Sequence, residues 1–464
     1  MFYTAVVTTT QSLFNLSSTD GRYSSKTAPL AKIFSEAALI SNRITIEVEY
    51  LLLLSKYKIV RKLSPKEQKL LRSFCLLDTK QLLRVKTIEQ ETHHDVKAVE
   101  YFLREKISNT SLVDLSSFIH FGVTSEDINN LAYRLMIKKA LKEVIIPELI
   151  STLINLNQLA ETYKDQPMLA RTHGQAAIPT TFGKEIAVFI SRINPLIKKV
   201  NYHQLVGKFN GAVGGYQALA LAYPNKDWLK ITQELVESFG LKHLALSTQI
   251  NPQDDLINLF QTLQHLNLIL IGLNQDIWHY ISDDWLVQLG KKNRVGSSTM
   301  PQKVNPIEFE NSEGNLKLAN GFIEVFINNF PISRLQRDLS DSTIQRNIGT
   351  CFAHCLLGYQ SISEGLKKIK VNKKKVEADL LSNWNILSEA LQTIARKNGD
   401  KLAYEKVAKL SKQKKFGKNE WLQLVKEVDP SLELITPLNY LGLSTLLTEK
   451  VVIQTHQLIK EIQQ

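Results

Sequence analysis

A glycine-led stretch at residues 296–306 has the composition of an anion-binding loop. It reads Gly-Ser-Ser-Thr-Met-Pro-Gln-Lys-Val-Asn-Pro. The hydroxyls of Ser297 and Ser298 and the ammonium of Lys303 can donate hydrogen bonds to an anion. Asn305 and Pro306 suit a helix start, whose free N–H groups also bind anions. A surface loop followed by a well-made helix cap explains the same residues equally well.

Histidines are natural candidates for proton transfer, because their reference pKa of about 6.5 allows both protonation states near neutrality. The chain has 10 histidines, and a lone one is more often structural or simply exposed. His173 precedes a glycine that leaves room for a ligand, between two segments predicted to be long helices. His93 and His94 are adjacent, but no third ligand follows at a metal-binding spacing, so we expect no metal.

Thr124 and Ser125 stand directly before another segment that is predicted to be a long helix. Thr124 and Asp127 have the spacing of a capping box, in which each side chain bonds the backbone of the other residue. The same helix end can bind an anion, so a capping role and a binding role are compatible.

Long helices are the elements that must position these residues. Glycine and proline, 20 and 13 residues, make up about 7% of the chain, against about 12% in average proteins. Hydrophobic periodicity predicts helices over residues 125–163, with a possible bend at Pro147, and over 180–206 and 254–285. Further helices are predicted near Pro306 and after Asp341. No strand–helix alternation indicates a parallel sheet, so the predicted fold class is all-α with a central bundle.

The helix predicted over residues 254–285 is the most apolar part of the chain. Residues 268–271 are apolar all round, so we expect this helix to be buried on every side. No continuous apolar run approaches the ~18–20 residues that cross a bilayer. The first residues lack the layout of a signal peptide. Cys75, Cys351 and Cys355 match no metal spacing, and we expect a reducing, cytoplasmic setting and no membrane partner.

We predict three helical domains from the changes in helix length and polarity. They are an N-terminal domain at 1–116, a central domain of long helices with the glycine-led loop at 117–366, and a C-terminal domain at 367–464. The chain has 57 Lys and Arg against 45 Asp and Glu, a net charge of +12. That excess can indicate nucleic-acid binding. However, the lysine clusters at 367–375 and 412–418 lack interleaved aromatic residues, so we expect no nucleic-acid partner.

The glycine-led stretch resembles the signature of the fumarase/aspartase superfamily, lyases that release fumarate, whose pattern is G-S-S-x-M-P-x-K-x-N-P. Elsewhere the chain resembles the adenylosuccinate lyase branch in its longer bacterial form. The matching stretches lie at residues 20–23, 94–101, 119–130, 170–175, 297–315 and 334–346. The resemblance implies a helical fold and β-elimination of fumarate from adenylosuccinate, giving AMP. It also implies the same reaction on the succinyl-aminoimidazole-carboxamide ribotide of purine biosynthesis.

Such an elimination needs a base, an acid and a cradle for the developing negative charge. The resemblance implies Ser297 as the general base, His173 as the general acid and His94 as a residue that supports the acid. It implies that Thr124, Ser125, Lys303 and Asn305 bind the succinyl arm. The remaining substrate residues that it implies are Arg22, Tyr23, His93, Asp95, Gln249, Ser298, Asn311, Arg337, Ser342, Thr343 and Arg346. His93 stands where the family usually has asparagine, and Asn251 and Gln253 replace the usual glutamate and histidine.

The resemblance further implies no cofactor, no metal, and a homotetramer whose active sites each take residues from three chains. Fumarase, aspartase and argininosuccinate lyase share the serine loop and are alternatives within the class. A scaffold that has lost catalysis is an alternative from another class. It is disfavoured because His173, Ser297, Lys303 and Asn305 are all present.

Overall fold

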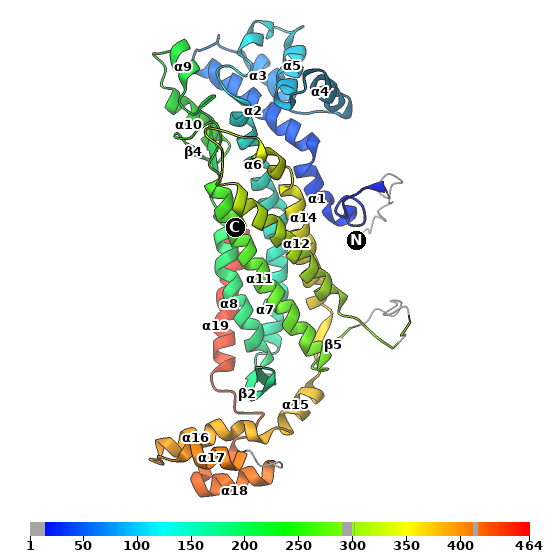
Figure 1. Ribbon diagram of the computed structural model, residues 1–464, viewed down its shortest axis with the longest axis vertical. Helices are drawn as coiled ribbons and strands as arrows, with labels where there is room; N and C mark the ends of the chain where they lie inside the picture. The colour runs from blue at the N-terminus through cyan, green and yellow to red at the C-terminus, as the bar shows by residue number, and fades with distance from the viewer. Residues whose placement is uncertain (1–13, 290–298, 301, 412–415) are drawn as a thin grey trace. The chain divides into compact units, whose positions relative to one another are not determined.

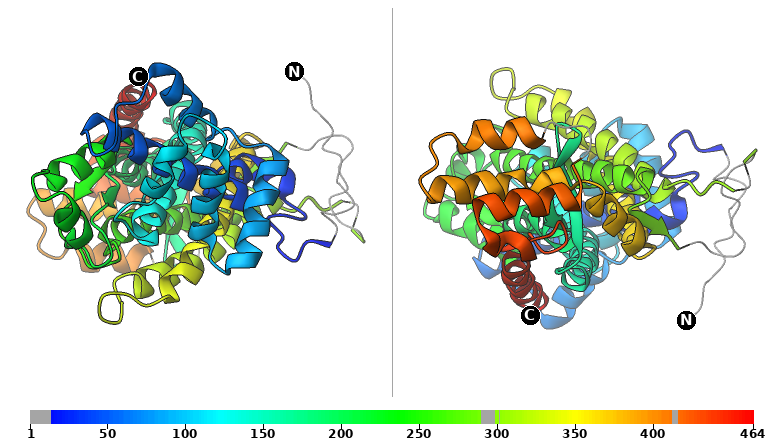
Figure 2. Two further views of the ribbon diagram at one scale, coloured as in Figure 1. Left: turned by 90° about the horizontal axis from the view of Figure 1, so that it is seen from above. Right: turned by 90° about the horizontal axis from the view of Figure 1, so that it is seen from below.

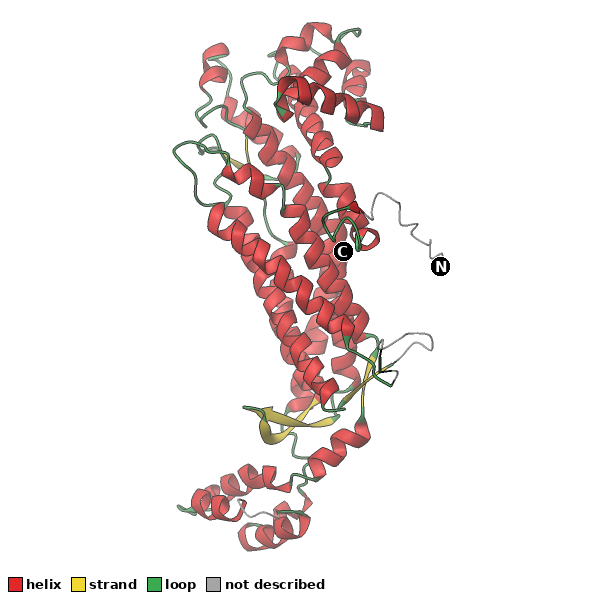
Figure 3. Cartoon of the chain, turned by 45° about the vertical axis from the view of Figure 1, so that its right-hand side comes forward, coloured by secondary structure: helices red, strands yellow, loops and turns green. Residues whose placement is uncertain are grey.

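The computed structural model describes residues 14–289, 299–300, 302–411 and 416–464. Helices dominate it, and the strands of the described part form three short two-stranded sheets (Figure 3). The predicted helical fold class is therefore confirmed. Backbone contacts divide the chain into two compact units. The first comprises Met1–Pro147, Lys199–Asn267 and Asn315–Leu357, and the second comprises Glu148–Lys198, Leu268–Gly314 and Gly358–Gln464. The division into three domains stays a prediction.

The first unit contains most of the shorter N-terminal helices. Its elements are α1 (Ser24–Phe34), α2 (Glu36–Lys56), α3 (Pro65–Ser73), α4 (Thr79–Thr92), α5 (Asp95–Ile107), the 3-10 helix η2 (Val113–Phe118), α6 (Ser125–Ala140), the π-helical turn η3 (Leu141–Ile145), the parallel strands β3 (Val206–Lys208) and β4 (Lys242–Leu244), α9 (Gln217–Ala222), α10 (Trp228–Ser238) and α13 (Ser340–Gln345). Five longer helices contribute residues to both units: α7 (Ile146–Thr162), α8 (Phe182–Asn201), α11 (Asp254–Ser282), α12 (Ile307–Asn329) and α14 (Ile348–Leu366).

The bend expected at Pro147 takes the form of a π-helical turn just before it. The helix that starts at Ser125 passes through η3, Leu141–Ile145, and continues as α7. Proline lacks an N–H and its ring crowds the carbonyl four residues earlier, so one wider turn relieves the clash. The segment therefore stays helical throughout, as its periodicity predicts.

A cluster of aromatic rings forms part of the core of the first unit. Phe260 of α11 is fully buried, and its ring centroid lies 4.8 Å from that of Phe326 and 6.1 Å from that of Phe352. Phe352 in turn stacks on Phe34 of α1 at 5.4 Å. These contacts join α1, α11, α12 and α14. Burial of one such side chain stabilises the fold by about 1.5–3 kcal/mol.

The second unit holds the two antiparallel sheets and the C-terminal helices. Its elements are β1 (Pro167–Thr172), β2 (Gln175–Thr181), β5 (Leu286–Gln288), β6 (Ile369–Val371), α15 (Lys373–Leu381), η4 (Trp384–Leu387), α16 (Ser388–Lys397), α17 (Ala403–Ser411), α18 (Lys418–Val428), η5 (Pro430–Leu434) and α19 (Ser444–Gln463). Helices α16, α17 and α18 pack together (Figures 1 and 2). Trp421 of α18 is fully buried among them.

The most apolar helix, α11, differs from its prediction in one respect. It contains an 18-residue window with a mean hydropathy of 1.4, so by length and composition it could cross a membrane. However, 61% of that window is buried inside the chain, as in a core helix. Ile269 and Leu270 are buried as predicted, but Leu268 is 56% exposed. The expectation that this helix is covered on every side is therefore wrong for the single chain.

Candidate active site

The first group of candidate residues surrounds the start of α5, in the first unit. Helix α4 ends at His93, whose φ of 53° turns the chain so that His94 becomes the N-cap of α5. The Nδ1 atom of His94 accepts a hydrogen bond from the Lys97 N–H at 3.2 Å. A neutral ring in this position carries its proton on Nε2. That atom lies 3.5 Å from Oγ of Ser125, so the structure brings two of the predicted site residues together.

Asp95 is held between two arginines from distant parts of the chain. Its Oδ2 accepts from Nη2 of Arg43 at 2.6 Å and from Nη2 of Arg346 at 3.3 Å. Burial would raise the pKa of Asp95, but the charge and hydrogen bond of Arg43, with Arg346, outweigh it, so this pKa lies below its usual range. Arg43 also donates to Asn129 at 2.9 Å. Asp95 is therefore a charged anchor that connects α2, α5 and the residue after α13.

The start of α6 is fixed by a buried carboxylate. Asp127 is fully buried and its Oδ2 accepts from the Thr124 N–H at 2.9 Å, which confirms half of the predicted capping pair. The N–H groups of Asn210 and Gly211 also donate to this carboxylate, at 2.9 and 3.0 Å. The ammonium of Lys208 lies 2.9 Å from Oδ1. The cap is therefore tied to the strand β3 and to the residues after it, and Thr124 and Ser125 are left half-buried at the helix end.

Gln249 and Arg337 form a second pair of predicted residues in contact. The Gln249 side chain donates to the Ala212 carbonyl at 2.7 Å and accepts from Nη1 of Arg337 at 3.1 Å. The neighbours that depart from the family pattern have structural partners. Asn251 donates to the Val206 carbonyl at 2.8 Å, and Gln253 accepts from a buried arginine. Both side chains are buried, so these two departures from the family pattern alter the contacts that hold the loop of Gln249 in place.

Four other predicted substrate residues, Arg22, Ser342, Thr343 and Arg346, are only partly gathered. Arg346 lines a cavity of ≈ 370 Å³ together with residues of the turn at 19–20, of α1 and of α14. Arg22 is exposed, with its guanidinium 6.0 Å from the ring centre of Tyr23. Ser342 and Thr343 lie on α13, half-buried and exposed respectively. The structure therefore places Arg346, but not Arg22, Ser342 or Thr343, at the wall of this cavity.

In the second unit, His173 occupies the tip of a β-hairpin. Strands β1 and β2 pair with Thr172 opposite Gln175, so His173 and Gly174 are the two turn residues. Their φ angles are +53° and +74°, as a type I′ turn requires. A Cβ on Gly174 would meet nothing within 4 Å, so the turn requires this glycine for its backbone angle alone. His173 is exposed, and its ring has no hydrogen-bond partner among the described residues.

The hairpin is anchored by the arginine that precedes it. The Arg171 guanidinium lies 5.2 Å from the ring centre of Trp285, and its Nε lies 3.3 Å from a carboxylate oxygen of Asp283. The Trp285 Nε1–H donates to Asp379 at 2.8 Å. A cation over an aromatic face contributes about 0.5–2 kcal/mol to stability. The contacts of Arg171 therefore stabilise the hairpin whose turn contains His173.

The glycine-led loop is only partly described. Ser297 and Ser298 lie outside the described residues. Lys303 is exposed and Asn305 half-buried. The helix α12 begins at Ile307, so Pro306 takes the cap position that was predicted for Asn305. Asn311 donates to Oγ of Ser361 on α14 at 2.7 Å. Among the described residues, no contact joins His173 to Lys303 or Asn305.

Sequence reasoning missed three residues that hold the site. Arg43 lies among apolar residues of α2 and is 2% exposed, Glu126 is 2% exposed, and Asn210 is fully buried. Arg43 could have been noticed in the sequence, because it is a charged residue within an apolar stripe of a predicted helix. The partner of such a residue lies far away in the sequence, so its role required the structure.

The fold is shared with solved structures of two enzymes. It superimposes on a fumarate lyase from Mesorhizobium sp. BNC1 with a TM-score of 0.76 and 19% identity, covering 92% of this chain and 97% of that chain. A 3-carboxy-cis,cis-muconate lactonizing enzyme from Pseudomonas putida gives a TM-score of 0.75 and 18% identity, covering 93% and 97%. Both structures therefore share this helical fold with the chain.

Sequence comparison identifies the branch. Residues 21–321 match the family described as Lyase, and residues 333–444 match the family described as Adenylosuccinate lyase C-terminal. The chain is 42% identical to the adenylosuccinate lyase of Haemophilus influenzae over 450 residues, 94% of this chain and 98% of that protein. It is 41% identical to the adenylosuccinate lyase of Escherichia coli strain K12, with 93% and 97% covered. The chain belongs to the adenylosuccinate lyase family.

Proposed function

We propose that this chain catalyses β-elimination of fumarate from adenylosuccinate, giving AMP, and from the succinyl-aminoimidazole-carboxamide ribotide, giving the carboxamide ribotide. The observation that carries this proposal is the identity of 41–42% with curated adenylosuccinate lyases along nearly their whole length. The cationic and hydroxyl groups gathered in the first unit suit a substrate with a phosphate and two carboxylates.

In the proposed reaction, Ser297 removes a proton from the carbon beside a carboxylate of the succinyl arm. The C–N bond then breaks, and His173 protonates the departing nitrogen. The developing dianion needs nearby positive charge and N–H donors. Lys303, Asn305 and the start of α6 at Thr124 and Ser125 supply such groups. His94, whose Nε2 lies 3.5 Å from the Ser125 hydroxyl, supports the acid and contacts the same arm.

We assign the nucleotide end of the substrate to the other predicted residues. Gln249 and Arg337 already form a hydrogen-bonded pair. Asp95 holds Arg346 at 3.3 Å, beside a cavity that we assign to the phosphate. The remaining contacts of this proposal are Arg22, Tyr23, His93, Asp95, Ser298, Asn311, Ser342 and Thr343.

We propose a cytoplasmic homotetramer whose active sites each take residues from three chains. Long helices carry exposed apolar side chains, among them Leu268 at 56% and Leu318 at 55% exposure. Apolar surface on this scale is typical of an interface between subunits. The exposed position of His173 also fits a site that a second chain completes. Light scattering should give a mass about four times the 52.7 kDa of one chain.

The activity is tested by proton NMR of fumarate release from adenylosuccinate, with argininosuccinate, aspartate and malate in parallel. Fumarate from adenylosuccinate alone, absent in Ser297→Ala and His173→Ala, supports the proposed reaction and both roles. Mixing the two inactive variants should restore activity if one site takes its acid and base from different chains. Fumarate from another substrate overturns the assignment of adenylosuccinate as the substrate. If a folded tetramer releases no fumarate from any of them, the proposal that the chain is an enzyme is wrong.

A further inference from the structure

A buried carboxylate adjoins the pair formed by Arg337 and Gln249. Glu126 lies in the first turn of α6, directly after Ser125, and is 2% exposed. Its Oε2 is 3.8 Å from Nη2 of Arg337, while Nη1 of the same guanidinium donates to Gln249 at 3.1 Å. Glu126 therefore acts on a guanidinium that also engages a predicted substrate residue.

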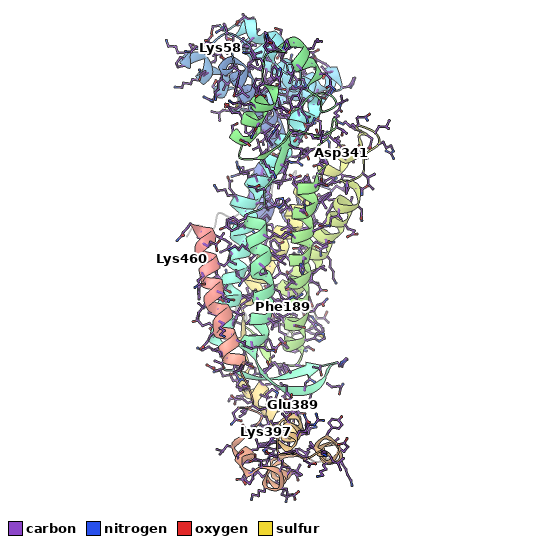
Figure 4. The ribbon with its side chains drawn as sticks, turned by 90° about the vertical axis from the view of Figure 1, so that its left-hand side faces the viewer. Lys58, Phe189, Asp341, Glu389, Lys397 and Lys460 are labelled. Atoms are coloured by element: carbon purple, nitrogen blue, oxygen red, sulfur yellow. The ribbon has the colours of Figure 1, made fainter. Side chains whose placement is uncertain are left out.

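Asp341 brings a second carboxylate to the same group. It lies in the first turn of α13, labelled in Figure 4, and is 9% exposed. It interacts electrostatically with both Glu126 and Arg337. Glu126 Oε1 and Asp341 Oδ1 are both buried and have no hydrogen-bond partner among the described residues. A buried carboxylate oxygen without a donor is costly, so protonation of one of the two groups is favoured.

The surrounding charges leave Arg337 to balance both carboxylates. The charged groups that act on Glu126 are, from the strongest, Arg337, Asp341, Lys208 and Arg134. Lys208 and Arg134 are already paired with buried carboxylates, Asp127 at 2.9 Å and Asp255 at 2.7 Å. Asp338, which also acts on Asp341, accepts hydrogen bonds from the N–H groups of Arg334 and Ser340. Among these cations, Arg337 is therefore the one that has no other carboxylate partner in the described residues.

We propose that Glu126 is a positioning residue that holds Arg337, and with it Gln249, for the anionic substrate, and that Glu126 and Asp341 together carry one proton at neutral pH. With one proton, the pair carries a single negative charge that matches the single charge of Arg337. Burial raises the pKa of Glu126 to about 7, and Asp341 adds to this rise while Arg337 opposes it. Burial also raises the pKa of Asp341. The inference rests on the proposed function, because that function assigns Arg337 and Gln249 to the substrate.

Loss of the shared proton should weaken substrate binding. Above pH 7 the pair gains a second negative charge beside the guanidinium, and this charge repels an anionic substrate. Glu126→Gln imitates the protonated carboxyl in shape and charge. Glu126→Ala removes the group that holds Arg337. Glu105→Gln is the matched control, because Glu105 forms an exposed ion pair with Arg84 in the same unit.

The test measures KM and kcat for fumarate release from adenylosuccinate between pH 5.5 and 8.5. We expect the KM of wild type to rise more steeply above pH 7 than that of Glu126→Gln. The ionisation of the substrate is common to both proteins, so their difference isolates Glu126. Glu126→Ala should raise KM about tenfold at every pH with kcat within about threefold, and Glu105→Gln should match wild type. A Glu126→Gln profile that parallels wild type, or an unchanged KM in Glu126→Ala, overturns the proposal.

The pH dependence of unfolding tests the shared proton without reference to activity. A carboxyl whose pKa is raised on folding destabilises the fold as pH rises from about 4.5 to about 7. The Tm of Glu126→Gln minus that of wild type should therefore increase over this range and then level off. A constant difference overturns the shared proton. If wild type releases no fumarate, the proposed function fails, and this profile still decides whether the pair carries the proton.

Discussion

Asp127→Asn should destabilise the chain severely, although it replaces one atom by another of similar size. The carboxylate accepts three backbone N–H groups, those of Thr124, Asn210 and Gly211, and lies 2.9 Å from the ammonium of Lys208. The three N–H groups and the ammonium divide into two at each oxygen. An amide has a single acceptor oxygen, so in either orientation two donors face an NH₂ group.

The magnitude follows from these contacts. Each buried donor that loses its acceptor costs about 1–3 kcal/mol. Lys208 is fully buried and also loses its counter-charge, and breaking a buried ion pair costs about 3–5 kcal/mol. The effects share one site and do not add in full, so we expect a loss of about 4 kcal/mol, a large part of a typical 5–15 kcal/mol.

Urea unfolding at a fixed protein concentration measures this loss, because the proposed oligomer would make stability depend on concentration. Asp227→Asn is the matched control. Asp227 is an exposed N-cap that accepts from the Lys230 N–H at 3.1 Å, and asparagine caps a helix as well as aspartate does. The control should stay within about 0.5 kcal/mol of wild type. A loss below about 1 kcal/mol in Asp127→Asn, at an unchanged m-value, would refute the reasoning.

Three further changes have expected outcomes. Gly174→Ala should lower both kcat and the free energy of unfolding, the latter by about 1–2 kcal/mol. The reason is that φ is +74° in the turn that contains His173. Activity equal to that of wild type contradicts this. Phe260→Ala should lose about 3–5 kcal/mol in urea unfolding, since its fully buried ring contacts others of the core; a loss below 1 kcal/mol would mean that the core closes over the gap. The Glu47 carboxylate outweighs burial and raises the pKa of His120. The stability from this pair should be complete below about pH 6.5 and fall as pH rises through the raised pKa, a dependence that His120→Gln should abolish in thermal unfolding scans across pH.

Features that depend on neighbours a few residues apart could be predicted from the sequence. The helix at Pro65 begins with a capping box of Ser64 and Glu67, two residue types that indicate such a box when they lie three positions apart. The long helices follow their hydrophobic periodicity, and Thr124 is capped by Asp127. The residues of the signature loop identify the lyase class because their types and spacing are themselves the pattern.

The pairing of distant residues was decided by the tertiary structure alone. Asp95 meets Arg43, 52 positions away, and Arg346, 251 positions away. The exposure of Leu268 differed from what the hydrophobic periodicity predicted. The type I′ turn at His173 is a feature that periodicity does not address. Glu126 looked like an ordinary acidic residue in the first turn of a helix, yet it is buried against Arg337.

The division has a physical cause. Capping and helical periodicity depend on groups within about four residues, whose distances the helix itself sets. The sequence by itself therefore determined the helical fold, its caps and the set of chemical groups available to the site. Burial and charge pairing depend on which helices pack together, and the desolvation of a carboxylate is set by every neighbour at once. The tertiary structure decided which groups meet, and so which carboxylates are paired with a cation.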